Sequence, residues 1–184
     1  MEELLDLYDR HGRPTGVTIP RGAGMPQAPE GMYWRVCDVW LVNRRGELLV
    51  QRRAMTKENW PGRWCESAGG AVRAGESAED GCVRETLEEI GVRPDMNRGG
   101  MIFEYLGGHA LHQVWLFHQD VPLSDLRLQA EEVADARYVT PAELRAMAAR
   151  KEFIPLGYLE QFLTMLPVLL HAAGKDDDCH VKDL

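Results

Sequence analysis

Apolar and polar residues alternate through much of the first half of the chain, which is the pattern of half-buried β-strands. The alternation predicts two short strands around the polar turn at residues 11–14, then a loop at 23–31. It also predicts a hairpin from about Trp34 to Arg53 across the turn at 43–47. A loop at 55–64 and a strand at 65–72, which ends in a Gly-Gly bend, should follow.

A helical period replaces the alternation between Ser77 and Ile90. Ser77 suits the N-cap, acidic residues occupy the first turn, and Gly91 is placed to end the helix. Residues at intervals of four should turn one side to the core, and these are Ala78, Cys82, Thr86 and Ile90.

The second half of the chain predicts further strands and two more helices. Strands are expected at about 101–107, 111–119 and 136–140, and a short helix at 140–150 begins with Thr140 as N-cap and Pro141 in its first turn. A final helix at 155–173 should bend at Pro167. Its apolar stripe comprises Leu159, Phe162, Leu163 and Leu166.

Strands interspersed with helices predict a mixed α/β sandwich (α+β) rather than a doubly wound sheet. The 184 residues are expected to form one domain over 1–184. Within it, residues 1–30 would be an N-terminal hairpin and linker, 31–150 the core, and 151–184 a C-terminal helix and a mobile polar tail.

Composition narrows the class of protein. Hydrophobic residues make up 45% and charged residues 27%, and no segment approaches the roughly 20 apolar residues that a bilayer crossing needs. With no signal peptide evident, we expect a cytoplasmic protein without a membrane partner. The cysteines lack metal-site spacing and are expected to be free thiols; they are Cys37, Cys65, Cys82 and Cys179.

The net charge of −8 argues against nonspecific binding to nucleic acid or to an anionic membrane. Phosphates could still bind where the chain supplies local basic groups, a metal ion, or both.

Three carboxylates are crowded on one face of the helix at 77–90. Glu85, Glu88 and Glu89 lie three and four residues apart, where like charges each cost about 0.2 to 0.5 kcal/mol. They also lie near the helix C-terminus, where the macrodipole disfavours anions. Arg84 can pair with Glu88, but a hard divalent cation fits three carboxylates better. The alternative is a solvated, salt-bridged helix face after a glycine-rich turn.

The whole segment from residue 70 to 92 resembles the Nudix box. In that box a glycine is followed after five residues by Glu and after seven more by Arg-Glu. An aliphatic residue, any residue, Glu-Glu, any residue, Gly and an aliphatic residue complete it. Only Thr86 departs, replacing an aliphatic residue. The matching residues are Gly70, Glu76, Arg84, Glu85, Glu88, Glu89, Gly91 and Val92.

The resemblance implies a Nudix-type α/β/α sandwich with a mixed sheet. It also implies hydrolysis, dependent on Mg²⁺ or Mn²⁺, of a diphosphate linked to a further group, often a nucleoside. The residues that would handle metal and water are the Gly69 carbonyl, Glu85, Glu88 and Glu89. Arg84 would hold the carboxylates and Glu76 would brace the loop.

The family leaves the general base open. Glu85, Glu88 or an acid outside the box could remove the proton from the attacking water, and the outside candidates are Glu131 and Glu132. For these two acids the alternative is an ordinary loop position.

The region of about 4–145 is also similar to isopentenyl-diphosphate isomerases and to uncharacterised Nudix hydrolases related to them. The similarity implies that Arg53 and Lys57 bind the diphosphate, as cations in a phosphate-directed loop would. The alternative for both is surface charge.

The residues that would make an isomerase are missing. The catalytic cysteine position holds Gly69, and Gln113 lies near the catalytic glutamate position. The two metal-binding histidine positions hold Trp34 and Ala71. We therefore expect hydrolysis and no isomerisation.

Other features leave the substrate open. Trp34 or Trp60 could stack on a base, although tryptophans are more often packed in the core. His109 and His112 lie near a predicted strand turn, where exposed loop histidines are expected, with a role in substrate binding as the alternative. Two alternatives to the hydrolase remain: a non-catalytic nucleotide-binding module and an isoprenoid-diphosphate isomerase or hydrolase. A homodimer is possible.

Overall fold

The computed structural model describes residues 3–22 and 26–178, with side chains described as far as His171. The predicted polar tail and Cys179 lie outside these residues. The strands are β1 Leu4–Tyr8, β2 Pro14–Pro20, β3 Trp34–Val42, β4 Leu48–Arg53, β5 Trp64–Cys65, β6 Ala68–Ala71, β7 Gly99–Gly107, β8 Ala110–His118 and β9 Val133–Val139. The helices are α1 Ala78–Ile90, α2 Pro141–Ala149 and α3 Leu159–Asp178, with a 3-10 turn η1 at Leu123–Asp125.

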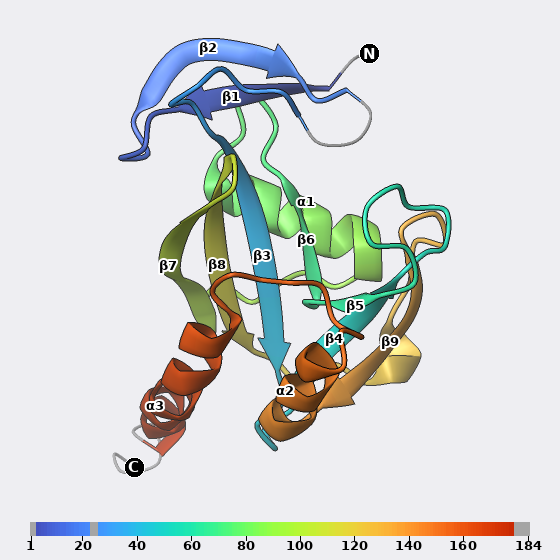
Figure 1. The fold of residues 1–184 in the computed structure, drawn as a ribbon. Coiled ribbons are helices and arrows are strands. Elements are labelled where there is room, and N and C mark those ends of the chain that lie inside the picture. The colour runs from blue at the N-terminus through green and yellow to red at the C-terminus, as the bar shows by residue number, and fades with distance from the viewer. Residues whose placement is uncertain (1–2, 23–25, 179–184) are drawn as a thin grey trace.

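A mixed sheet forms the middle layer (Figure 1). Its main strand order is β5-β4-β3-β8-β7, with β6 paired to β3 and β9 paired to β4. The β3–β8 pair is parallel, and the other pairs are antiparallel. Helix α1 covers one face, and α2 and α3 cover the other. The predicted α/β/α sandwich with a mixed sheet is therefore confirmed.

Strands β1 and β2 form a separate two-stranded sheet at one end of the molecule, as predicted for the N-terminal hairpin (Figure 1). This hairpin is tied to the main body through strand β3. Tyr8 forms an isolated bridge with Tyr33, and its ring lies 3.9 Å from the Arg35 guanidinium carbon. Leu5 and Leu7 are buried against Trp34.

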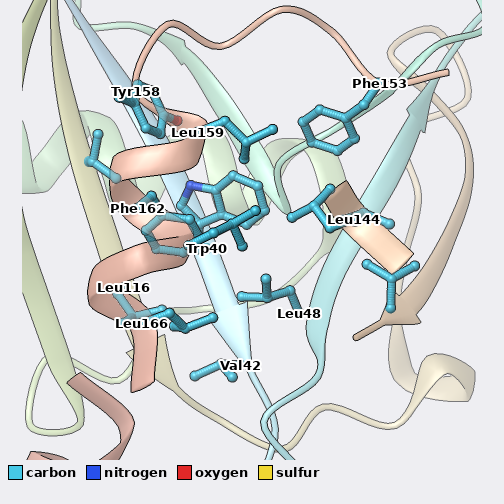
Figure 2. Close-up of a cluster of buried hydrophobic side chains, with 14 of the residues drawn as sticks. Trp40, Val42, Leu48, Leu116, Leu144, Phe153, Tyr158, Leu159, Phe162 and Leu166 are labelled. Carbon is cyan, nitrogen blue, oxygen red and sulfur yellow. The ribbon is translucent and has the colours of Figure 1, made fainter. Parts of the chain in front are cut away.

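The core face opposite α1 is built around Trp40 (Figure 2). Its ring stacks on Phe162 of α3 at 4.7 Å and on Phe153 at 6.1 Å between ring centroids. The predicted apolar stripe of the last helix is buried here, which confirms it. The helix starts at Leu159 and not at residue 155, because the residues before it form a loop that carries Tyr158 to the sheet.

Strands β3 and β4 form the predicted hairpin, but they are paired only beside the turn. Their ladder contains the pair Val42 and Leu48, after which β3 pairs with β6 and β8 while β4 pairs with β5 and β9. The Ser67 hydroxyl bridges the gap, since it accepts from Leu41 N at 2.8 Å and donates to Leu49 O at 2.6 Å.

The prediction of a single strand at 65–72 is therefore wrong in one respect. The segment is two short strands, β5 and β6, because the chain crosses from β4 to β3 at Glu66–Ser67. Neither periodicity nor composition signals such a crossing.

Helix α1 matches the prediction closely. The Ser77 hydroxyl accepts from Asp80 N at 3.0 Å, and Gly91 ends the helix in the left-handed conformation with φ of 74°. Cys82, Thr86 and Ile90 are buried, and Ala78 packs against the same cluster. The N-cap of α2 is Thr140, as predicted.

The three cysteines within the described residues are buried free thiols, as predicted: Cys37, Cys65 and Cys82. Among the described helices, none combines the length and apolar character needed to cross a membrane. Pro167 lies inside α3, and the helix continues beyond it; the bend stays a prediction.

Candidate active site

The carboxylates of α1 are held by one guanidinium. Arg84 donates through Nε and Nη2 to Glu76, at 2.7 and 2.9 Å, and through Nη1 to Glu85 at 2.6 Å and Glu88 at 3.3 Å. A fifth bond goes to the Ala71 carbonyl at 3.0 Å. Desolvation alone would raise the pKa of Glu76, but Arg84 and Arg73 together outweigh it and lower that pKa. The positive charge expected beside the acidic face is therefore partly supplied by Arg84.

Glu89 turns away from this network toward the sheet. Its Oε2 accepts from the Gly69 amide at 3.0 Å and from the Gln51 side chain at 2.7 Å. Burial, followed by the nearby charge of Glu85, raises the pKa of Glu89 to about 8. Burial also raises the pKa of Glu85, against the pull of Arg84. Two desolvated acids side by side provide a strong local preference for positive charge.

The two glycines of β6 allow this close approach. A Cβ on Gly70 would lie 2.4 Å from the carboxyl carbon of Glu85, which is closer than any real contact. A Cβ on Gly69 would lie 2.8 Å from the Cys37 carbonyl and 2.9 Å from Glu66 Oε1. Gly70 therefore makes room for a box carboxylate, and Gly69 makes room for Glu66.

The donor set fits a hard divalent cation by its chemistry. Glu85, Glu88 and Glu89 offer only oxygen ligands, and the glycines let backbone approach them. Among the side chains of residues 3–22 and 26–171, no three His, Cys, Asp or Glu already converge as a metal site. The carboxylates are instead paired with Arg84, Gln51 and the Gly69 amide.

A groove of about 660 Å³ is lined by three of the site residues that were predicted outside the box. Arg53, Lys57 and Glu132 all line it, and Arg21 joins them from the end of β2. Lys57 Nζ forms an ion pair with Glu132. The Gln129 amide donates to the Glu89 carbonyl at 2.9 Å, and the Glu132 amide donates to the Gln129 carbonyl at 2.9 Å, which ties this side of the groove to the end of α1.

Trp34 lies apart from this groove. Its side chain is only 2% exposed and packs with Leu5, Leu7, Ala71 and Ala110, while one side of the ring stacks on His109 at 6.4 Å. No open face is left for a base, so this placement does not support the stacking role considered for Trp34.

Trp60 is 46% exposed, with the Arg63 guanidinium carbon 4.9 Å from its ring. Of the two tryptophans considered for stacking, it is the one with an accessible ring.

Two of the positions related to isomerase residues lie together. Trp34 and Ala71 share one apolar cluster, so no metal ligand is present there. Gln113 is buried and donates to Glu104 at 2.8 Å.

Sequence reasoning missed three polar residues on the opposite side of β6 from Glu85, where they lie with His112: Asp38, Glu66 and Tyr158. His112 lies in β8 and not in a loop, and its Nδ1 is 2.9 Å from Asp38 Oδ2. The sequence did contain one signal. Asp38 and Glu66 are acidic residues within predicted strands, at positions where buried residues were expected.

Comparison with known proteins adds independent evidence. The family model described as the NUDIX domain matches residues 32–157. An uncharacterised Nudix hydrolase of Listeria monocytogenes is 38% identical over 165 residues, covering 90% of this chain and 95% of the relative. A protein of Streptomyces coelicolor named isopentenyl-diphosphate Delta-isomerase is 32% identical over 157 residues, covering 82% and 77%.

Solved structures share the fold. A crystal structure of a Deinococcus radiodurans protein has a TM-score of 0.71 at 23% identity and covers 89% of this chain and 99% of its own. A MutT protein of Methanosarcina mazei has a TM-score of 0.56 at 23% identity, covering 73% and 93%. Together with the family model and the box carboxylates gathered on β6, these similarities show that the chain belongs to the Nudix hydrolase family.

Proposed function

We propose that this protein hydrolyses the diphosphate linkage of a nucleoside diphosphate derivative or a similar small diphosphate, with Mg²⁺ or Mn²⁺ as cofactor. The observation that supports the proposal most is the contact between the carboxylates of α1 and the glycines of β6. Glu89 accepts from the Gly69 amide at 3.0 Å, and the Glu85 carboxyl fills the space beside Gly70. Nudix hydrolases in general act on such linkages and use divalent metals.

The residues that would hold the cation are the Gly69 carbonyl, Glu85, Glu88 and Glu89. A bound divalent cation neutralises phosphate charge and lowers the pKa of a bound water. Glu88 is the accessible member of the set, with 44% of its side chain exposed, whereas Glu85 and Glu89 are buried. Arg84 keeps Glu85 and Glu88 in place through its bonds to both.

Arg53 and Lys57 would bind the diphosphate in the groove. Lys57 is ion-paired with Glu132, and Arg53 donates to the Asn59 carbonyl at 2.9 Å. A phosphate group would compete with Glu132 for Lys57, because both are anions within reach of one ammonium group. Glu132 released in this way could accept a proton.

Three carboxylates are candidates for the general base. Glu85 and Glu88 are bonded to Arg84, and Glu132 lines the groove. Conservative Glu→Gln variants of each, compared by the pH profile of kcat, identify the base as the one whose loss removes the acidic limb of the profile.

Isomerisation of an isoprenoid diphosphate is not favoured, although a relative bears that name. Gly69 offers no thiol, and Gln113 offers an amide that is already bonded to Glu104. Deuterium uptake from solvent into isopentenyl diphosphate would restore this alternative.

The proposed activity is tested by incubating the protein with a panel of diphosphates and Mg²⁺, and analysing the products by mass spectrometry. Cleavage of at least one compound at a phosphoanhydride bond, abolished by removal of the metal, is expected. Binding of nucleotides without cleavage of any compound would instead favour a non-catalytic module.

A further inference from the structure

Gln51 is a polar residue at a core position of β4. Strand alternation turns Leu49 and Gln51 to the same side, and Leu49 belongs to the apolar cluster packed against α1. In the neighbouring strands Gln51 is paired with Cys65 and Ala136, and it is 3% exposed. An apolar side chain would suit these surroundings, so the amide at this position needs a separate explanation.

The Gln51 amide faces the carboxylate of Glu89 on α1, with Nε2 donating to Oε2 at 2.7 Å. A carboxylate that binds a cation is ionised and only accepts hydrogen bonds, so the NH₂ group must point toward it and the amide oxygen away from it. That oxygen, Gln51 Oε1, is buried and finds no hydrogen-bond partner among the residues that the structure describes. Native proteins seldom leave a buried polar atom unsatisfied. The bond to Glu89 therefore comes with an unsatisfied oxygen that an apolar residue would avoid.

Glu89 receives its two donors from strands that diverge. The Gly69 amide, in β6, donates to the same oxygen as Gln51, at 3.0 Å. Strand β6 pairs with β3, whereas β4 pairs with β5 and β9, and the β3–β4 ladder contains the pair Val42 and Leu48 beside the turn. Glu89 Oε2 thus bridges the opening between the two parts of the sheet. Two donors on one oxygen fix the rotation of the carboxylate and leave Oε1 to face a cation.

We propose that Gln51 is a positioning residue of the cation site, because its amide holds Oε2 of Glu89 against the sheet and so presents Oε1 to the cation. The inference rests on the proposed function and adds to it a residue outside the box, on a different element. Without Gln51, the Gly69 amide alone would hold the oxygen, and the carboxylate would be free to rotate. Hydrogen bonds that orient metal ligands typically change metal affinity or activity by about 10- to 100-fold.

Calorimetric titration of the whole protein with Mn²⁺, without substrate, tests this role. Gln51→Met keeps an unbranched side chain of similar length and removes the amide, so the Kd for Mn²⁺ should rise at least about tenfold. Gln113→Met is the matched control. Gln113 is also buried, and its Oε1 is also unpartnered among the described residues, but its amide donates to Glu104 of β7 and not to a box residue. The control should bind Mn²⁺ as the wild type does.

Melting temperatures separate a positioning role from a structural one. Each variant loses one amide–carboxyl bond and one buried unsatisfied oxygen, so the two melting temperatures should change by similar amounts in metal-free buffer. A glutamine with a purely structural role would change the melting temperature and leave Kd unaltered. The rise in melting temperature produced by Mn²⁺ should be smaller in Gln51→Met than in Gln113→Met, because a weaker ligand stabilises less at the same concentration.

If Gln51→Met does not fold, Gln51→Asn replaces it, because the shorter side chain withdraws the amide from Glu89 and stays polar. Its Kd for Mn²⁺ should rise as well. A wild-type Kd in the Gln51 variant, or an equal rise in the Gln113 control, would overturn the inference and leave the hydrolase function standing. Absence of saturable Mn²⁺ binding in the wild type would overturn it together with the cation site. A rise in the Gln51 variant alone, in a protein that cleaves no diphosphate, would support the positioning role and refute the hydrolase function.

Discussion

Buried carboxylates on the two faces of β6 differ in their hydrogen bonds. On the α1 face, Glu85 is bonded to Arg84, and Glu89 is bonded to Gln51 and to the Gly69 amide. On the other face, Glu66 keeps one oxygen without a partner. The first arrangement holds carboxylates in fixed positions against their own repulsion, as a cation site requires. The second leaves one buried carboxyl oxygen without a hydrogen bond from any described residue.

Under the proposed function, the α1 face together with Arg53 and Lys57 would bind the charged diphosphate, which all candidate substrates share. Changes on the α1 face should therefore alter turnover of every substrate.

The largest effect is expected from the acids of the α1 face. Glu88→Gln and Glu89→Gln should each lower kcat about 10²- to 10⁴-fold while the circular dichroism spectrum stays unchanged, because an amide is a poor ligand for a divalent cation. Glu79→Gln, on the exposed first turn of the same helix, is the control and should keep full activity. Full activity in both box variants would refute the proposed role of this face.

Loss of the central guanidinium should be the largest effect on stability. Arg84→Met leaves Glu76 and Glu85 without their partner, and we expect the free energy of unfolding to fall by about 3 kcal/mol. Arg145→Met breaks the exposed pair with Glu160 and should change it by less than about 1 kcal/mol. Urea denaturation measures both, and equal losses in the two variants would contradict the special position of Arg84.

A methyl group on β6 should have a smaller, local effect. Gly70→Ala places a Cβ 2.4 Å from the Glu85 carboxyl carbon and should cost about 1 to 3 kcal/mol, with a matching fall in kcat as Glu85 moves. Gly100→Ala, in β7, meets nothing within 4 Å and should be neutral or slightly stabilising. Thermal unfolding of the two alanine variants therefore tests close packing without a change in charge.

The smallest expected effect is a pH dependence of stability that comes from the His112–Asp38 pair on the face opposite α1. Desolvation lowers the pKa of His112, but the bond to Asp38 outweighs it and raises the pKa above its ordinary value. A raised pKa in the folded state contributes stability that is present below the unfolded pKa of about 6.5 and is lost as pH rises through the folded value. The stability difference between the wild type and His112→Gln should thus be greatest in mild acid. A difference independent of pH would show that the pair does not titrate.

Most of the residues on the α1 face could be predicted from the sequence. Fixed residue types at fixed offsets identified Arg84, Glu85, Glu88 and Glu89, because helix geometry alone places side chains three and four residues apart on one face. The caps Ser77 and Gly91 were readable for the same reason, since a helix end depends on its own few residues.

The opposite face could not be read in this way, because it is assembled from distant segments. Asp38 and His112 are 74 positions apart, and their contact depends on the parallel pairing of β3 with β8. The early divergence of β3 from β4 also left no local trace, since Ser67 bridges it through tertiary bonds. Trp34 was considered for the pocket by residue type alone, whereas its burial depends on how the N-terminal hairpin packs.

The central claim is that the α1 face binds a divalent cation, and Mn²⁺ binding followed by electron paramagnetic resonance tests it most directly. Titration of the wild-type protein should remove the signal of free Mn²⁺ saturably, and Glu85→Gln and Glu89→Gln should each weaken binding at least about tenfold. Glu79→Gln should bind as the wild type does. The same affinity in all four proteins, or no saturable binding in the wild type, would contradict the account.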